Sequence, residues 1–147
     1  MPRFRLAQLL RREGEAAGAK RELELCLRRA PNFSWAHQEL GRAWLDLNER
    51  NKSRRAFDEA VKLAKDESLQ AYFLAWAALA AEGEHREKRA KGVTTLYPGF
   101  AAAQEAGARE AMEDEAYERA KELVRLGLAV SPKSLGLMEM RRQLRKL

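Results

Sequence analysis

The sequence predicts an all-α fold: a right-handed superhelical solenoid of antiparallel helix pairs, with about four repeats and a C-terminal capping helix. Leu6, Leu40 and Leu74 stand 34 residues apart, and so do Pro98 and Pro132. Apolar residues recur at spacings of three and four, which is typical of helices that face a core. Ala, Leu, Glu, Lys and Arg, all good helix formers, dominate the composition. A period of this length indicates one two-helix unit stacked on copies of itself.

Size and composition restrict the class of protein. The chain has 147 residues, of which 46% are hydrophobic and 34% charged, so it is far too apolar for a disordered protein and long enough for a substantial core. No apolar run approaches the roughly 20 residues that a membrane span needs. Residues 1–5 lack the apolar stretch of a secretory signal, and a single cysteine excludes an internal disulfide. We therefore expect one domain, residues 1–147, in the cytoplasm.

The period divides this domain into repeats. We expect them at residues 1–33, 34–67, 68–99 and 100–133, followed by the capping helix at 134–147. The predicted helices span residues 4–13, 16–29, 34–47, 51–64, 68–81, 85–96, 101–112, 116–130 and 135–147.

Turn and cap residues set the ends of the first four helices. Gly14 hinges the first pair, and Pro31 stops it, since proline cannot continue a helix. Residues 48–51 form the turn of the second pair. Ser34 stands where the third helix needs an N-cap, because a serine hydroxyl can accept a hydrogen bond from a free backbone N–H.

The later helices carry similar signals. Gly83 turns the third pair, and Pro98 and Pro132 stop the third and fourth pairs. Ser68 and Ser134 stand at N-cap positions. The last helix has an apolar stripe at helical spacing and a cationic face, as a helix that closes a stack requires. The stripe consists of Leu137, Met140, Leu144 and Leu147.

Equivalent positions of the repeats form packing columns. A small residue in the first helix of each pair lets the second helix approach closely, and larger residues fill the space between them. The small residues of the first helices are Ala7, Gly41, Ala75 and Ala108. Those of the second helices are Cys26, Ala60, Val93 and Gly127. Because Cys26 stands in such a column, we expect a buried small hydrophobe rather than a reactive thiol.

These columns resemble those of the tetratricopeptide repeat (TPR) family. The second repeat reads Leu40-Gly41-x-x-Trp44 and then Phe57-x-x-Ala60. The first and fourth repeats keep the small positions and the closing proline. The third departs most, because Arg86 falls on a small position. The resemblance covers almost the whole chain and implies stacked helix pairs that bind a partner in a concave groove.

A second stripe runs along the first helices on a different face from the packing columns, since successive residues of a helix are rotated by about 100°. Its side chains are of types that favour binding to a partner. In the resembled family this stripe lines the groove. We expect the groove here to have aromatic residues at its centre and arginines on both sides, which are side chains that often anchor interfaces. The predicted partner-binding residues are Arg12, Trp35, Gln38, Arg42, Tyr72, Phe73, Trp76 and Arg109. The alternative is that the aromatic cluster packs against neighbouring helices or the last helix.

A cationic row recurs early in each second helix. It consists of Lys20/Arg21, Lys52/Arg54/Arg55, Arg86/Lys88/Arg89 and Arg119/Lys121. With a net charge of +6, such a row on one edge permits contact with a phosphate backbone. Acidic residues interleave with these cations, which favours an ordinary charged helix exterior.

The sequence contains few of the residue combinations that catalysis requires. His37 and His85 each lack a second histidine or a cysteine at ligand spacing, and no phosphate-binding loop follows a strand. We therefore expect no enzyme activity, no catalytic residue, no metal and no cofactor. The sequence favours a protein–protein interaction module that holds a peptide or helix of a partner. The alternatives are an RNA-associated helical-repeat protein and an oligomerisation or spacer module, and homo-oligomers fit the first and the last.

Overall fold

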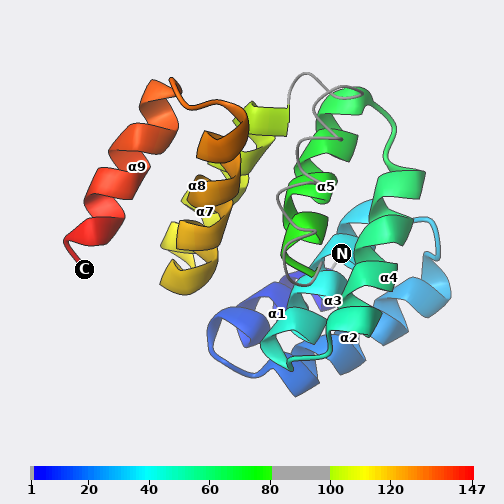
Figure 1. Ribbon diagram of the computed structural model, residues 1–147. Coiled ribbons are helices and arrows are strands. Elements are labelled where there is room, and N and C mark those ends of the chain that lie inside the picture. The colour runs from blue at the N-terminus through cyan, green and yellow to red at the C-terminus, as the bar shows by residue number, and fades with distance from the viewer. Residues whose placement is uncertain (1, 81–99) are drawn as a thin grey trace. The chain divides into compact units, whose positions relative to one another are not determined.

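The computed structural model describes residues 2–80 and 100–147. Within these residues it contains eight helices and no strand (Figure 1). The helices are α1 (Pro2–Arg12), α2 (Ala16–Arg29), α3 (Ser34–Asp46), α4 (Arg50–Leu63), α5 (Glu67–Ala80), α7 (Phe100–Glu113), α8 (Tyr117–Val130) and α9 (Leu135–Arg145). Each corresponds to a predicted helix, with ends that differ by at most two residues. The predicted helix 85–96 lies outside the described residues.

The helices form two compact units. The N-terminal unit, Met1–Lys65, holds α1 to α4, and the C-terminal unit, Asp66–Leu147, holds α5 and α7 to α9. In the N-terminal unit each helix packs against the next one along the chain, and α1 also contacts α3. In the C-terminal unit α5 packs on α7 and α8, α7 on α8, and α9 on α8 and α7. Among the described helices, none combines the length and apolar character that a bilayer crossing requires.

The same tight turn ends the first helix of three pairs. Gly14, Asn48 and Glu115 have positive φ angles of 84°, 60° and 59°. The N–H after each bonds back to the carbonyl five residues earlier, at 2.7 Å from Glu15 to Leu10, with 2.8 Å at the other two turns. The left-handed residue's own N–H bonds three residues back at each turn. This arrangement is the Schellman motif, which satisfies the last carbonyls of a helix. It explains why Gly14 marks the first turn.

Three helices of one unit correspond to three helices of the other. α2 begins at Ala16 and α8 at Tyr117, while α3 begins at Ser34 and α9 at Leu135, so both pairs are 101 positions apart. The same shift relates the turn residues with positive φ, Gly14 and Glu115. Helices α1–α3 and α7–α9 are therefore two copies of one packing arrangement, which we call the two triplets.

The small columns have the predicted role in close packing. A Cβ placed on Gly41 of α3 would lie 2.8 Å from the Phe57 ring of α4. A Cβ on Gly127 of α8 would lie 2.6 Å from Cδ1 of Leu137 on α9. Of the two columns, every residue that the structure describes is buried. Val93 lies outside the described residues.

The N-cap predictions met mixed outcomes. Ser134 caps α9, since its hydroxyl accepts a hydrogen bond from the Leu137 N–H at 3.4 Å. Ser34 is wrong as a cap, because Phe33 occupies the cap position and makes no side-chain bond. Ser68 is also wrong: α5 begins one residue earlier, and Asp66 Oδ1 accepts from the Leu69 N–H at 2.8 Å. The carboxylate of Asp66 took the role because it precedes the helix.

Candidate functional site

The structure separates the predicted partner-binding residues by exposure. Arg12, Trp35 and Arg109 are exposed, with Trp35 showing 40% of its surface to solvent. Tyr72 is half-buried, and its ring meets the Phe73 ring edge-on at 6.0 Å between centroids. Arg109 bonds to Glu105 one turn earlier on α7, at 3.0 Å. The exposed indole of Trp35 on α3 is therefore the most accessible aromatic of the predicted set.

The remaining four predicted residues are buried. Gln38, Phe73 and Trp76 expose none of their surface, and Arg42 exposes 1%. Trp76 of α5 packs against α7, since its Nε1 lies 3.3 Å from the place where a Cβ on Gly107 would stand. In the described structure these four side chains are part of the interior. The alternative weighed for the aromatic cluster, packing against neighbouring helices, thus describes Phe73 and Trp76.

The N-terminal unit contains a buried ionic cluster that the sequence did not reveal. Arg11 Nε donates to Glu39 Oε2 at 2.9 Å, and Arg42 Nη1 lies 3.5 Å from Glu39 Oε1. The side chains of all three are at most 4% exposed. Burial of a charge costs several kcal/mol unless opposite charges and hydrogen bonds compensate it. The carboxylate of Glu39 therefore contacts two buried guanidinium groups, Arg11 on α1 and Arg42 on α3.

No local sequence signal pointed to this cluster. Arg11 and Glu39 stand on different helices, 28 positions apart in sequence. Only the pair Glu39 and Arg42 has a helical spacing, and such pairs are common on solvated helix faces. The signal that could have found the cluster is the alignment of Arg11 and Glu39 with Met112 and Met140, which the shift of 101 positions relates. Two charges at positions that are apolar elsewhere in the repeat indicate burial.

Two members of the predicted cationic row bind an aromatic ring. Lys20 Nζ of α2 lies 5.1 Å from the centre of the Trp44 ring, and Lys52 Nζ of α4 lies 4.7 Å from it. A cation within about 6 Å of an indole face is attracted by the ring quadrupole. Trp44 thus fills the space on α3 between α2 and α4 and holds an ammonium group from each. Arg86, Lys88 and Arg89 of the row lie outside the described residues.

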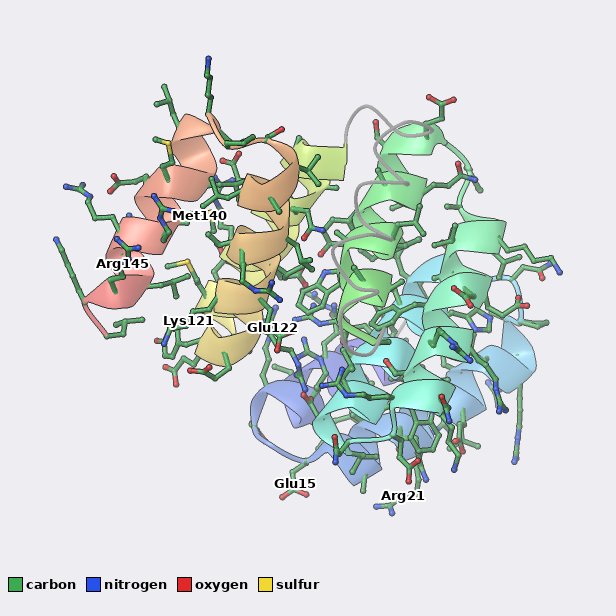
Figure 2. All side chains as sticks on the ribbon, in the orientation of Figure 1. Glu15, Arg21, Lys121, Glu122, Met140 and Arg145 are labelled. Atoms are coloured by element: carbon green, nitrogen blue, oxygen red, sulfur yellow. The ribbon has the colours of Figure 1, made fainter. Side chains whose placement is uncertain are left out.

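The C-terminal unit has a cavity of about 330 Å³ between α8 and α9. Its floor is apolar, formed by Val124, Leu128 and Leu144. Its rim is cationic, formed by Lys121, Arg125, Arg141 and Arg145. Figure 2 labels a rim residue from each helix, Lys121 on α8 and Arg145 on α9. Its volume is at the lower end of the range for ligand pockets, roughly 300 to 1,000 Å³.

The reactive side chains of the described residues have structural roles. Cys26 is buried, and burial raises the pKa of its thiol, which disfavours the nucleophilic thiolate. Nε2 of His37 lies 2.9 Å from the Pro31 carbonyl, so it ties α3 to the preceding turn. Within residues 2–80 and 100–147, no group of three or more His, Cys, Asp or Glu side chains is arranged to hold a metal.

Comparisons with known proteins found similarity in structure only. No protein-family model matches the sequence, and no curated protein matches it. A crystal structure of MamA is 17% identical, with a TM-score of 0.52, over 95% of this chain and 82% of that one. A second crystal structure of the MamA protein gives 17% identity and a TM-score of 0.55 over 98% and 85%. The MamA RS-1 ArsTM double mutant gives 17% and 0.53 over 97% and 94%.

An identity of 17% supports a statement about fold and none about activity. The likeness spans nearly the whole of this chain, and helix pairs with equivalent turns recur in both units. These findings confirm the predicted fold class. The chain is an all-α protein with a TPR-like helical-repeat fold.

Proposed function

We propose that this chain is a non-enzymatic protein-interaction module of the TPR type, whose N-terminal unit binds a peptide or helix of a partner. The observation that carries the proposal is the exposed Trp35 on α3. Tryptophan is among the side chains that most often dominate binding energy at interfaces. Large exposed apolar side chains are also present on α1, where Leu6 and Leu9 are 44% and 55% exposed.

Arginine next to this apolar surface adds polarity to the proposed contact. Arg12 is exposed on α1, the helix that packs beside α3. A guanidinium group can hold a carboxylate of the partner with two parallel hydrogen bonds. Beneath the surface, the buried Arg11–Glu39 pair joins α1 to α3. That pair supports the proposal because a rigid surface loses less entropy when a partner binds.

The proposal changes which residues a test should alter. Arg42 and Trp76 are buried, so substituting them would disturb folding as well as binding. Arg12 and Trp35 stay as proposed contacts of the partner on the N-terminal unit, and Tyr72 and Arg109 as proposed contacts of a partner on the C-terminal unit. We propose that Gln38, Arg42, Phe73 and Trp76 act by holding the helices in place. A cytoplasmic location, the lack of a cofactor, and homo-oligomers as one form of partner belong to the same proposal.

Site-specific photo-crosslinking tests the assignment. A photoreactive phenylalanine analogue at Trp35 should crosslink a defined partner in the source cell, while the same analogue at Leu25, exposed on α2, should not. With that partner purified, Trp35→Ala should weaken binding by roughly 30-fold, or about 2 kcal/mol. Leu25→Ala should leave the affinity within twofold. Equal crosslinking at both positions would refute the assignment to Trp35.

The RNA-associated alternative predicts a different dependence on salt. Affinity for single-stranded RNA should then fall steeply as salt rises and be lost on neutralising Arg54 and Arg55. The contacts of Lys20 and Lys52 with Trp44 favour a packing role for that part of the row. A filter-binding series in salt, with wild type and Arg54→Gln/Arg55→Gln, separates the two functions.

A further inference from the structure

We propose that the cavity between α8 and α9 binds an acidic segment of a partner protein that carries an aromatic side chain. The cavity lies in the C-terminal unit and shares no residue with the Trp35 surface. The proposal therefore goes beyond the function proposed above and stands independently of it.

The two triplets differ at the place where the cavity lies. The shift of 101 positions relates Lys121 of α8 to Lys20 of α2, and Arg145 of α9 to Trp44 of α3. In the N-terminal unit the Trp44 indole occupies this place, with Lys20 5.1 Å from its centre. In the C-terminal unit Lys121 and Arg145 line open space. The cavity thus corresponds to the site of an indole ring.

A second position near the cavity also differs between the two triplets. Arg141 is equivalent to Leu40, which packs against the core of the N-terminal unit. Both Arg141 and Arg145 are exposed, so their guanidinium groups stay in solvent while Val124, Leu128 and Leu144 remain as the floor. Because no aromatic side chain of this chain covers the aliphatic floor, binding an aromatic side chain of a partner there is favourable. Such binding removes apolar surface from water.

The charges around the cavity indicate which groups of the partner should flank its aromatic side chain. Residues 117–147 contain eight Lys or Arg and three Glu. Glu139 pairs with Arg142 at 2.7 Å and Glu118 with Lys121 at 3.3 Å, and Glu122 is also engaged. Arg141 and Arg145 make no hydrogen bond or ion pair with any residue that the structure describes. Carboxylates are the natural partners of such guanidinium groups.

The spacing of the two arginines suits an extended peptide. Residues four apart on a helix are separated by roughly 6 Å along its axis. The two residues that flank one position of an extended chain are about 6.6 Å apart. Because successive side chains of an extended chain point to opposite faces, an aromatic side chain on the floor leaves its two flanking carboxylates on the solvent side, where the exposed side chains of Arg141 and Arg145 also end. This match specifies an acidic-aromatic-acidic sequence.

Fluorescence anisotropy with a labelled synthetic peptide tests the proposal on the full chain. The probe has one central tryptophan with three glutamates on each side, and its matched control has alanine in place of the tryptophan. The tryptophan peptide should bind at least tenfold more tightly than the alanine peptide. Arg141→Glu/Arg145→Glu should weaken binding at least tenfold. Arg54→Glu/Arg55→Glu, which changes the net charge equally on exposed residues of α4, should change it less than twofold.

Filling the cavity from within provides an independent readout. Arg145→Trp should place an indole where Trp44 lies in the other triplet and abolish binding of the tryptophan peptide. Trp35→Ala should leave this binding unchanged, so failure here and failure of the proposed function are distinguishable.

Three results of the peptide measurements would overturn the proposal. They are equal affinity for the two peptides, undiminished binding by Arg145→Trp, and undiminished binding by Arg141→Glu/Arg145→Glu. Sedimentation supplies a further check. A wild-type dimer that Arg141→Glu/Arg145→Glu dissociates, without peptide binding, would also overturn the proposal and assign the cavity to a second copy of this chain.

Discussion

The triplets α1–α3 and α7–α9 share most helix ends, the turn at Gly14 and Glu115, and the pattern of helix contacts, but their side chains at equivalent positions differ in chemistry. In the first triplet a buried ionic cluster joins α1 to α3. In the second, the positions equivalent to Arg11, Glu39 and Arg42 hold Met112, which is half-buried, Met140, which is buried, and Gln143, which is exposed. This packing arrangement therefore accepts either a set of paired charges or a set of flexible, uncharged side chains at these positions.

The third helix of each triplet differs in how much of it is covered. α3 contacts both α2 and α4, and Gly41 lets the Phe57 ring of α4 approach. α9 contacts α8 and α7, and its position equivalent to Gly41 is Arg142, which is exposed. A small residue is needed only where a second helix packs. The cationic face of α9 is thus the consequence of a different environment in the same repeat position.

The largest expected effect comes from breaking the ionic cluster. Glu39→Met should destabilise the protein by about 3–5 kcal/mol, because it removes a buried carboxylate that two buried guanidinium groups contact. Arg11→Met/Glu39→Met/Arg42→Gln, which transplants the second triplet's set, should return stability to within about 1 kcal/mol of wild type. Urea unfolding followed by circular dichroism measures both. A triple variant as unstable as Glu39→Met would show that the two interiors are not interchangeable.

A smaller effect is expected from the α8–α9 contact. Gly127→Ala should cost about 1–3 kcal/mol, because its Cβ would lie 2.6 Å from Leu137 Cδ1. Gly18→Ala is the matched control: its Cβ would meet Leu10 at an ordinary 3.5 Å, so higher helix propensity should stabilise α2 by up to about 1 kcal/mol. Thermal unfolding of both variants measures the difference. Equal shifts in Tm would contradict the close approach at Gly127.

Filling the cavity should sharpen the comparison further. Arg145→Trp should raise stability by about 0.5–2 kcal/mol, since a cavity-filling side chain buries apolar surface beside Lys121. Arg142→Trp, on the exposed face of α9, should give no gain. Differential scanning calorimetry compares the two Tm values. A gain shared by both variants would point to helix propensity instead of the cavity.

The smallest effect concerns the Cys26 thiol. Burial raises its native pKa above the unfolded value, so its contribution to stability is complete below the unfolded pKa. The contribution is lost as pH rises through the native pKa. Wild type should therefore lose more stability than Cys26→Ala between neutral and alkaline pH. Urea titrations of both proteins along a pH series measure this difference, and parallel curves would exclude a buried, protonated thiol.

Local signals predicted the helices well, since apolar spacing, Gly14, Pro31 and Pro132 act within a few residues. The packing columns also followed from sequence, because a small residue at a fixed position has one steric reason. The exposure of the side chains in the second stripe could not be predicted from the sequence. Gln38 and Arg42 are polar and are nevertheless buried, since burial depends on which helices cover a face. A sequence period shows which face of a helix points to the core, but it does not show how far around the helix the covered surface extends.

The cavity was outside the reach of the sequence for a related reason. It arises from a missing side chain, and an absence has no motif. The alignment of Arg145 with Trp44 by the shift of 101 positions reveals what is missing. The pairing of Arg11 with Glu39 similarly required knowing that α1 and α3 are adjacent.

The nearest-neighbour contacts of the helices have a consequence for folding kinetics. Among the described helices, each one in the N-terminal unit touches helices one or two places away along the chain. Closing such short loops costs little entropy, and a low contact order is associated with folding in microseconds to milliseconds. Any adjacent pair can serve as the nucleus, and the remaining helices then add to it in turn. Stopped-flow or temperature-jump experiments should find a fast refolding phase that survives substitutions confined to a single helix pair.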